Sequence, residues 1–277
     1  WSSDVCSSDL TMMIGASSLA TQLKLSHPNL KIAFIGSHAS ALPHEVIQYR
    51  YVDFAFINEG VYGLLDLLET NLEDNLDNVR GMWYKKHGLP RPTSGGCIVP
   101  TSEMDTVMPG YAWDLLPKEK YLLDKYRSHF WHSNFSHEGR TPFAAIYTSL
   151  GCQFGCNFCM INIVNRTSHE EGVTSQDSRG MRFWSPELML KELEHLYENG
   201  VRTVRLTDEM FFLNKKYYVP ILEGIKQRGM DFNFWAYARV DSVRKDQLEL
   251  FKEAGVNWLC LGIEAADRKS TRLNSSH

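Results

Sequence analysis

The sequence predicts an α/β protein in two parts, a parallel sheet in its first half followed by part of a parallel (β/α) barrel. Short apolar runs alternate with helical patterns along the chain, an order that favours parallel strands. In the second half, glycines recur between a predicted helix and the strand that follows it. The hydrophobic content of 43% and the charged content of 22% are ordinary for a globular protein.

The two ends of the chain do not resemble protein sequence. Back-translation of residues 267–277, read on the complementary strand in another frame, gives the residues at positions 1–9. A single DNA sequence, read on opposite strands and similar to a sequencing-library adapter, therefore accounts for both ends. The alternative interpretation is that the two ends are unrelated serine-rich tails. We therefore expect residues 1–10 and 267–277 to be adapter-like artefacts, and the natural stretch between them to be cut at both ends.

Residues 11–90 are predicted to form a partial domain around a parallel sheet. The predicted elements are a helix over 13–25, a strand over 31–35, a helix over 43–49, a strand over 52–57 and a helix over 61–72. Parallel sheets bind ligands at the carboxyl ends of their strands. These ends carry Gly36, Ser37 and His38 after the first strand, and Glu59 and Gly60 after the second.

Residues 91–140 are expected to connect the two parts. Residues 88–108 are rich in Gly, Pro, Ser and Thr and are predicted to be a linker. Residues 111–140 are rich in aromatic side chains and histidine, without a clear period, and are predicted to be an irregular connector.

Residues 141–266 are predicted to form half of a TIM-like barrel, truncated after about four strands. Strands are expected over 143–149, 203–207, 232–238 and 258–263. Ser185 is a predicted helix N-cap, and Gly200, Gly229 and Gly255 are predicted to end three helices. In such barrels the active site lies at the carboxyl ends of the strands.

Residues 141–165 carry no charge, and a stretch of this length could span a membrane. It also holds several amides, two glycines and three cysteines, so a buried strand that leads into a cofactor loop is the preferred interpretation. We expect no membrane span. The net charge of −4 offers no basic footprint for nucleic acid, which is not expected as a partner.

Three cysteines, Cys152, Cys156 and Cys159, directly follow the first predicted barrel strand. Thiolates at this spacing can hold three irons of a 4Fe–4S cluster and leave the fourth iron open to a small molecule. A structural zinc site, which normally needs a fourth ligand, and a redox dithiol are the alternatives. Clustered cysteines are typical of a metal site in a cytoplasmic protein, whereas a secreted disulfide framework would spread them out.

This motif, with the aromatic Phe158 before its last cysteine, resembles that of the radical S-adenosylmethionine (SAM) superfamily. The resemblance implies that the open iron chelates the amino and carboxylate groups of SAM. Reductive cleavage of SAM would then give a 5′-deoxyadenosyl radical, which abstracts hydrogen from a small-molecule substrate. It also implies an electron donor such as flavodoxin or ferredoxin, since the cofactor chemistry needs a reduced cluster.

The same resemblance implies SAM contacts at the strand ends. Phe158 would lie near the adenine, Asp208 and Glu209 near the amino group, Arg239 near the carboxylate or ribose, and Glu264 near the ribose hydroxyls. The usual Gly-Gly-Glu of the family is absent. The structural alternative is that the acidic pair caps a helix and that Arg239 forms a surface ion pair.

The first half resembles the cobalamin-binding domain that precedes one large radical SAM class. The matching runs are Ile35-Gly-Ser-His38, Ala41-Leu-Pro, Val52-Asp, Asn58-Glu-Gly60 and Trp113-Asp-Leu-Leu-Pro117. The resemblance implies a truncated flavodoxin-like (Rossmann-like) domain in which Gly36, Ser37, His38, Glu59 and Gly60 contact cobalamin. His38 is one candidate for contact with the corrin, and the axial ligand cannot be identified.

The function expected from the resemblance is that of a cobalamin-dependent radical SAM enzyme. Its reaction would be methyl transfer to an unactivated carbon or an oxidative cyclisation. The alternatives are a cobalamin- or cluster-binding sensor or carrier without turnover, and a radical SAM methylthiotransferase. The latter places a cysteine-bearing domain first, whereas residues 11–140 hold only Cys97. The chain by itself is expected to be inactive, because half a barrel leaves an open edge.

Overall fold

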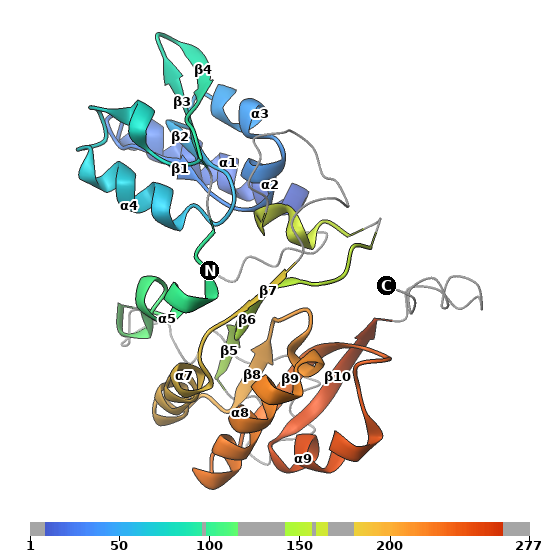
Figure 1. Cartoon of the computed structure of the whole chain (residues 1–277). Helices are drawn as coiled ribbons and strands as arrows, with labels where there is room; N and C mark the ends of the chain where they lie inside the picture. The colour runs from blue at the N-terminus through green and yellow to red at the C-terminus, as the bar shows by residue number, and fades with distance from the viewer. Residues whose placement is uncertain (1–8, 96–97, 116–141, 157–158, 166–179, 263–277) are drawn as a thin grey trace. The chain divides into compact units, whose positions relative to one another are not determined.

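The computed structural model describes residues 9–95, 98–115, 142–156, 159–165 and 180–262, and the chain divides into two compact units (Figure 1). The N-terminal unit comprises residues 1–100 and 151–180, and the barrel unit comprises residues 101–150 and 181–277. The segment that holds Cys152, Cys156 and Cys159, called the cysteine loop below, thus belongs to the same unit as the first half of the chain. None of the helices in these described ranges is long and apolar enough to cross a membrane.

The N-terminal unit is built on a four-stranded mixed sheet of order β1-β2-β3-β4. Its elements are α1 (Asp9–Ser26), β1 (Ala33–Phe34), α2 (Ser37–Ala41), α3 (Pro43–Gln48), β2 (Phe54–Phe56), α4 (Val61–Glu69), η1 (Leu76–Asn78), β3 (Met82–Lys86) and β4 (Leu89–Pro92). The strands β1 and β2 pair in parallel, as the alternation of strands and helices predicts.

The other two strands of this sheet correct the sequence interpretation. β3 pairs antiparallel with both β2 and β4, so β3 and β4 form a hairpin at the sheet edge. Its two turn residues, His87 and Gly88, have φ angles of 52° and 80°, which suit a tight hairpin turn. β4 therefore lies inside the stretch 88–108 that was predicted to be a linker, and the sheet is not wholly parallel.

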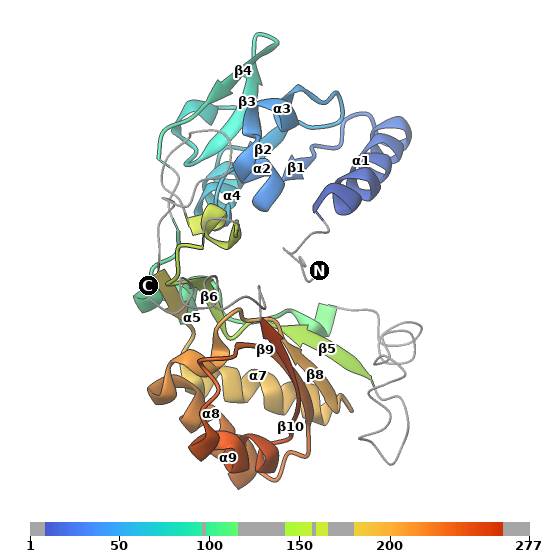
Figure 2. The same cartoon turned by 90° about the vertical axis from the view of Figure 1, so that its right-hand side faces the viewer.

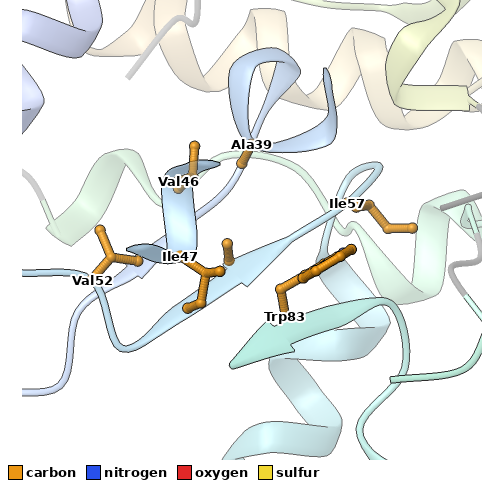
Figure 3. Packing of buried hydrophobic residues seen from close by; sticks show 7 residues of the cluster. Ala39, Val46, Ile47, Val52, Ile57 and Trp83 are labelled. Atoms are coloured by element: carbon orange, nitrogen blue, oxygen red, sulfur yellow. The ribbon is translucent and has the colours of Figure 1, made fainter. Parts of the chain in front are cut away.

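Side chains of this sheet alternate between two apolar layers. On one side, Ala55 and Ile57 pack with Val46 and Ile47 of α3 and with Trp83 of β3 (Figure 3). The opposite layer contains Phe54, Phe56, Leu67, Val79, Met82 and Tyr84. Helices therefore cover both faces, with α2 and α3 over one and α4 over the other.

The barrel unit holds a four-stranded sheet of order β10-β9-β8-β5 in which every pair is parallel. Its elements are η2 (Thr101–Glu103), α5 (Met104–Val107), η3 (Trp113–Leu115), β5 (Phe143–Ile146), α7 (Pro186–Glu198), β8 (Thr203–Leu206), η6 (Phe211–Leu213), α8 (Lys215–Gln227), β9 (Asn233–Arg239), η7 (Lys245–Gln247), α9 (Leu248–Glu253) and β10 (Val256–Gly262). The helices α7, α8 and α9 lie on the same side of this sheet (Figure 2).

Local signals set these elements as predicted. The Ser185 hydroxyl accepts a hydrogen bond from Leu188 N at 3.1 Å and caps α7, with Pro186 at the first helical position. Gly200, Gly229 and Gly255 follow three helices with φ angles of 83°, 63° and 88°, in the left-handed region. The four predicted parallel strands and three helix ends of this unit are confirmed.

Two further strands, β6 (Ser149–Cys152) and β7 (Gly180–Phe183), pair as a separate two-stranded sheet, and η5 (Ile161–Asn165) follows the cysteines. These strands pass from one unit to the other along the chain. This pairing was not predicted.

The segment before the barrel is fixed to α7 and its N-terminus. Asp105 Oδ1 accepts from Ser185 N at 2.9 Å, and the Trp184 indole donates to Met108 O at 2.7 Å. The Trp113 indole donates to Glu192 Oε2 at 3.0 Å. Trp113, the first residue of a run that carried part of the resemblance, is therefore held within the barrel unit by its indole.

Candidate functional site

The cysteine loop begins at the end of β6. The Cys152 side chain is 8% exposed, Cys156 is half-buried and Cys159 is exposed. The Phe154 main-chain N–H donates to Cys152 Sγ at 3.5 Å, and the Cys159 N–H donates to Cys156 O at 3.0 Å. Main-chain N–H groups that point at a ligating sulfur stabilise its negative charge, a means by which proteins adjust iron–sulfur sites.

Gly151 has no room for a side chain. Its φ angle is 84°, and a Cβ at this position would meet Gly180 O at 2.4 Å and Asn165 Nδ2 at 2.5 Å. The main chain before Cys152 therefore passes directly against β7 and the end of η5. Only glycine combines this conformation with this close approach.

The donor set fits an iron–sulfur cluster. All three thiols come from one short loop of the same unit, and three thiolates match the three protein-ligated irons of such a cluster. Within the described ranges, no group of three His, Cys, Asp or Glu side chains is yet close enough to hold a metal ion. Metal ligands often reach their final geometry only as the metal binds.

The cysteine loop lies beside the predicted cobalamin segment within the N-terminal unit. η5 contacts α2, the helix that begins at Ser37. Before it, Gly36 has φ 117° and ψ −167°, and an added Cβ would meet nothing within 4 Å. His38 Nε2 is buried without a hydrogen-bond partner among the described residues. Open space and an unpaired ring nitrogen fit a large ligand placed here.

The residues after β2, the second strand of this unit, are held by contacts within the protein. Asn58 and Gly60 have φ angles of 61° and 66°, and Asn58 is fully buried. The Glu59 carboxylate accepts a hydrogen bond from Val99 N at 3.2 Å. Glu59 therefore holds the chain after the hairpin, whereas Gly36 and His38 carry the better geometry for a ligand.

In the barrel unit, Asp208 and Glu209 follow β8 as predicted. Asp208 is 0% exposed, and its carboxylate accepts hydrogen bonds from Thr148 N at 3.0 Å, Thr148 Oγ1 at 2.8 Å and Ser149 Oγ at 2.5 Å. Burial raises the pKa of Asp208, and the bonds from Ser149 and Thr148 act in the opposite direction.

Glu209 has a different environment from its neighbour. It is half-buried, and burial raises the pKa of its carboxyl from 4.5 to about 8, with the Asp208 charge acting in the same direction. A carboxyl with such a pKa at a barrel strand end is a candidate for a functional group.

Arg239 ends β9 but forms a local ion pair. Its Nε and Nη2 atoms donate to the two carboxylate oxygens of Asp241 at 2.9 and 2.7 Å. This is the structural alternative stated for Arg239 above. The other predicted SAM contacts, Phe158 and Glu264, and also Cys97, lie outside the described residues.

The sequence reasoning missed a cluster on the sheet face opposite the helices. The Arg205 guanidinium lies 4.7 Å from the Trp235 ring centroid and 5.1 Å from that of Tyr237, and it donates to the Tyr237 hydroxyl. The alternation of buried Phe234 and Ala236 with Trp235 and Tyr237 along β9 is the signal that could have identified this face.

Residues 146–276 match the family described as the Radical SAM superfamily. The chain is similar to an uncharacterised methyltransferase of Pyrococcus horikoshii, with 27% identity over 257 residues, 92% of this chain and 50% of that protein. It is also similar to the hopanoid C-3 methylase of Methylococcus capsulatus, with 25% identity over 275 residues, 96% of this chain and 46% of that protein. The chain thus spans about half the length of these relatives.

The fold is shared with solved structures, among them the following two. One is the cobalamin-dependent S-adenosylmethionine radical enzyme OxsB with aqua-cobalamin and SAM bound, with a TM-score of 0.60, 17% identity and coverage of 96% of this chain and 35% of that one. The other is the radical SAM methyltransferase TsrM from Kitasatospora setae with cobalamin and a 4Fe–4S cluster bound, with a TM-score of 0.62, 15% identity and coverage of 92% and 46%. The chain is thus similar in sequence, over residues 146–276, to the radical SAM superfamily, and it shares its fold with these two solved structures.

Proposed function

We propose that the protein is a cobalamin-dependent radical SAM methyltransferase and that this chain carries its cofactor-binding part. The observation that carries the proposal is the cysteine loop, which leaves the glycine-constrained strand β6 and packs through η5 on the helix after Gly36. The relatives are named as methyltransferases or a methylase, which favours methyl transfer over cyclisation.

The proposal assigns each cofactor to particular residues of this chain. Cys152, Cys156 and Cys159 would hold the cluster, with the Phe154 N–H directed at the first sulfur. Cobalamin would lie against Gly36 and His38, where the main chain leaves space. When bound, the reduced cluster, SAM and cobalamin supply the electron and the methyl group for transfer to an unactivated carbon.

Glu209 is the proposed contact for the SAM amino group. A cation beside a half-buried carboxyl favours its charged form and so lowers its pKa. SAM binding would therefore release a proton from Glu209 at neutral pH, given the raised pKa of about 8. A small-molecule substrate and an electron donor such as flavodoxin or ferredoxin complete the proposal.

Electron paramagnetic resonance of the anaerobically reconstituted, reduced protein tests the proposal. We expect a 4Fe–4S signal that changes when SAM is added and that is absent in Cys152→Ala. The matched control is Cys260→Ala, which removes an exposed thiol outside the loop and should leave the signal unchanged. Cobalamin binding is checked separately by its visible absorbance after gel filtration.

Three outcomes would contradict the proposal. A cluster whose signal ignores SAM would favour a sensor or carrier, since SAM binding at the open iron is the defining property of the proposed chemistry. Stoichiometric zinc in place of iron would restore the zinc alternative. A SAM-responsive cluster without any cobalamin would leave a radical SAM protein of another class.

A further inference from the structure

The Asp208 carboxylate faces the chain between β5 and β6. Its Oδ1 atom accepts from the two hydroxyls of Thr148 and Ser149, at 2.8 and 2.5 Å. The Thr148 main-chain N–H donates to both oxygens, at 3.1 and 3.0 Å. All of these donors come from the two consecutive residues Thr148 and Ser149. The buried carboxylate therefore binds one short segment of the chain.

Neighbouring residues hold the same segment from other sides. The Tyr217 hydroxyl of α8 donates to Thr148 O at 2.5 Å. The Thr207 N–H and hydroxyl donate to Ile146 O at 2.8 and 2.7 Å. Residues 146–149 are therefore fixed to the carboxyl end of β8, the strand that lies next to β5 in the sheet (Figure 1).

This segment leads directly into the cysteine loop. Ser149 is the first residue of β6, and Cys152 is the last. Between them, Gly151 passes without side-chain room against Gly180 and Asn165. A strand of four residues that is held at its first residue and confined at its third leaves little freedom for the thiol at its fourth.

We infer that Asp208 is a positioning residue, whose carboxylate fixes Thr148 and Ser149 and thereby the first cluster cysteine, and that it does not contact SAM. The inference rests on the proposed function for the cluster, but its structural part stands on the bonds above. The inference gives different roles to the two acidic residues that follow β8. Asp208 faces the chain that leads to the cluster, and Glu209 remains the proposed contact for SAM.

The chemistry of the donors explains why a carboxylate is needed here. An ionised carboxylate has only acceptor sites, and all the groups that face it can donate. In Asp208→Asn, an Nδ2 amino group replaces one of the two oxygens that accept from the Thr148 main-chain N–H. Both groups are donors, and the main-chain N–H cannot become an acceptor. Asp208→Asn should therefore keep part of the network, and Asp208→Ala should lose it and leave three donors buried.

Cluster content and hydrogen exchange together test the inference. We expect Asp208→Ala to lower the affinity for the cluster about 10-fold, as loss of an outer partner of a metal ligand typically does, and Asp208→Asn to lie between it and the wild type. Ser149→Ala removes one donor and should broaden or shift the resonance of the reduced cluster. The matched control is Thr207→Val, which removes the hydroxyl bond to Ile146 O, keeps the Thr207 main-chain N–H bond to the same oxygen, and leaves every bond of Thr148 and Ser149 in place.

Hydrogen–deuterium exchange of the metal-free chain separates this inference from the proposed function. Residues 148–152 should exchange faster in Asp208→Asn and Ser149→Ala than in the wild type and in Thr207→Val. If the wild-type protein holds no cluster, the proposed function fails, and this exchange still decides whether Asp208 fixes the segment.

Two results would overturn the inference. The first is unchanged exchange of residues 148–152 in Asp208→Asn and Ser149→Ala. The second is a full cluster in Asp208→Asn with an affinity for SAM lowered as far as in Glu209→Gln, which would return Asp208 to the SAM site. If Asp208→Ala does not fold, the two milder variants carry the test.

Discussion

The parallel strands of the two units end in different ways. In the N-terminal unit, β1 and β2 lead into main chain with positive φ angles, at Gly36, Asn58 and Gly60, and the first of these leaves open space. In the barrel unit, β8 leads into a fully buried carboxylate and a half-buried one, Asp208 and Glu209.

The difference separates two ways of building a site at a strand end. A glycine at a strand end, such as Gly36, lets a broad ligand approach the backbone closely because it has no side chain. A buried carboxylate instead directs donors toward itself and fixes chain segments. The N-terminal strand ends should therefore be sensitive to an added methyl group, and those of the barrel unit to a lost charge. The following substitutions compare the two units in order of falling effect, and those of Gly36 and Glu209 test this contrast directly.

The largest effect is expected at a glycine of the barrel unit. A Cβ at Gly255, with φ 88°, would lie 2.0 Å from Phe232 O, a main-chain atom that cannot turn away. We expect Gly255→Ala to cost more than about 3 kcal/mol of unfolding free energy, from the strained conformation and the overlap together. Urea unfolding measures it. Gly229→Ala, with φ 63° and nothing within 4 Å, is the control and should cost less.

The open glycine of the N-terminal unit should behave differently. Gly36 has a φ and ψ that only glycine adopts easily, so Gly36→Ala is expected to cost about 1–3 kcal/mol of unfolding free energy. Its added methyl group enters the space assigned to cobalamin. Under conditions where the variant is folded, visible absorbance should show weaker cobalamin binding and unchanged iron content. Equal cobalamin binding in both proteins would contradict the proposed cofactor position.

Glu209 should make the barrel unit less stable as the pH rises. Its pKa is raised from 4.5 to about 8, so the folded protein retains a proton that the unfolded chain releases. The stabilising contribution is complete below the unfolded pKa and is lost as the pH rises through about 8. Glu209→Gln should remove a pH-dependent difference of at least about 1.4 kcal/mol, the value of one pKa unit. Urea unfolding at pH values of about 5 and 9 checks this, and a parallel loss in both proteins would assign the slope to other groups.

A helix cap gives the smallest expected effect. α7 has a side-chain cap at Ser185, whereas no side-chain hydrogen bond caps α3 or α4 of the N-terminal unit. Ser185→Ala should cost about 1 kcal/mol. Glu194→Ala, at an exposed position of the same helix, should change the unfolding free energy by less than about 0.5 kcal/mol. Equal effects of the two substitutions would show that the cap contributes nothing.

The sheet of the barrel unit could be predicted because its signals are local. Before β8, for example, a capping serine, an apolar helical face and a glycine at the helix end lie within the continuous stretch from Ser185 to Gly200. The hairpin was missed for the opposite reason. Pro90 and Pro92 are typical of a loop, and only the place of β4 at the sheet edge makes them compatible with a strand.

The candidate site was predictable in its residue types and not in its contacts. The spacing of the three cysteines was sufficient to predict a cluster, because all three proposed ligands come from one loop, and the cluster stays a prediction. The partners of Asp208 are 60 and 59 residues away in sequence, so no local pattern pairs them. From the sequence alone, Asp208 and Glu209 had the same proposed role; burial and hydrogen bonds distinguish them.

The prolines of β4 also bear on how the protein behaves at high concentration. Thr93 N donates to Met82 O across the hairpin. In this register the main-chain N–H groups of residues 91 and 89 also point toward β3, whereas the main-chain nitrogens of the two prolines point outward. An incoming strand from a second molecule would find no N–H at either proline position along this edge. Such edges resist intermolecular strand addition, the first step of aggregation. Replacing both prolines by threonine should therefore lower the solubility of the folded protein.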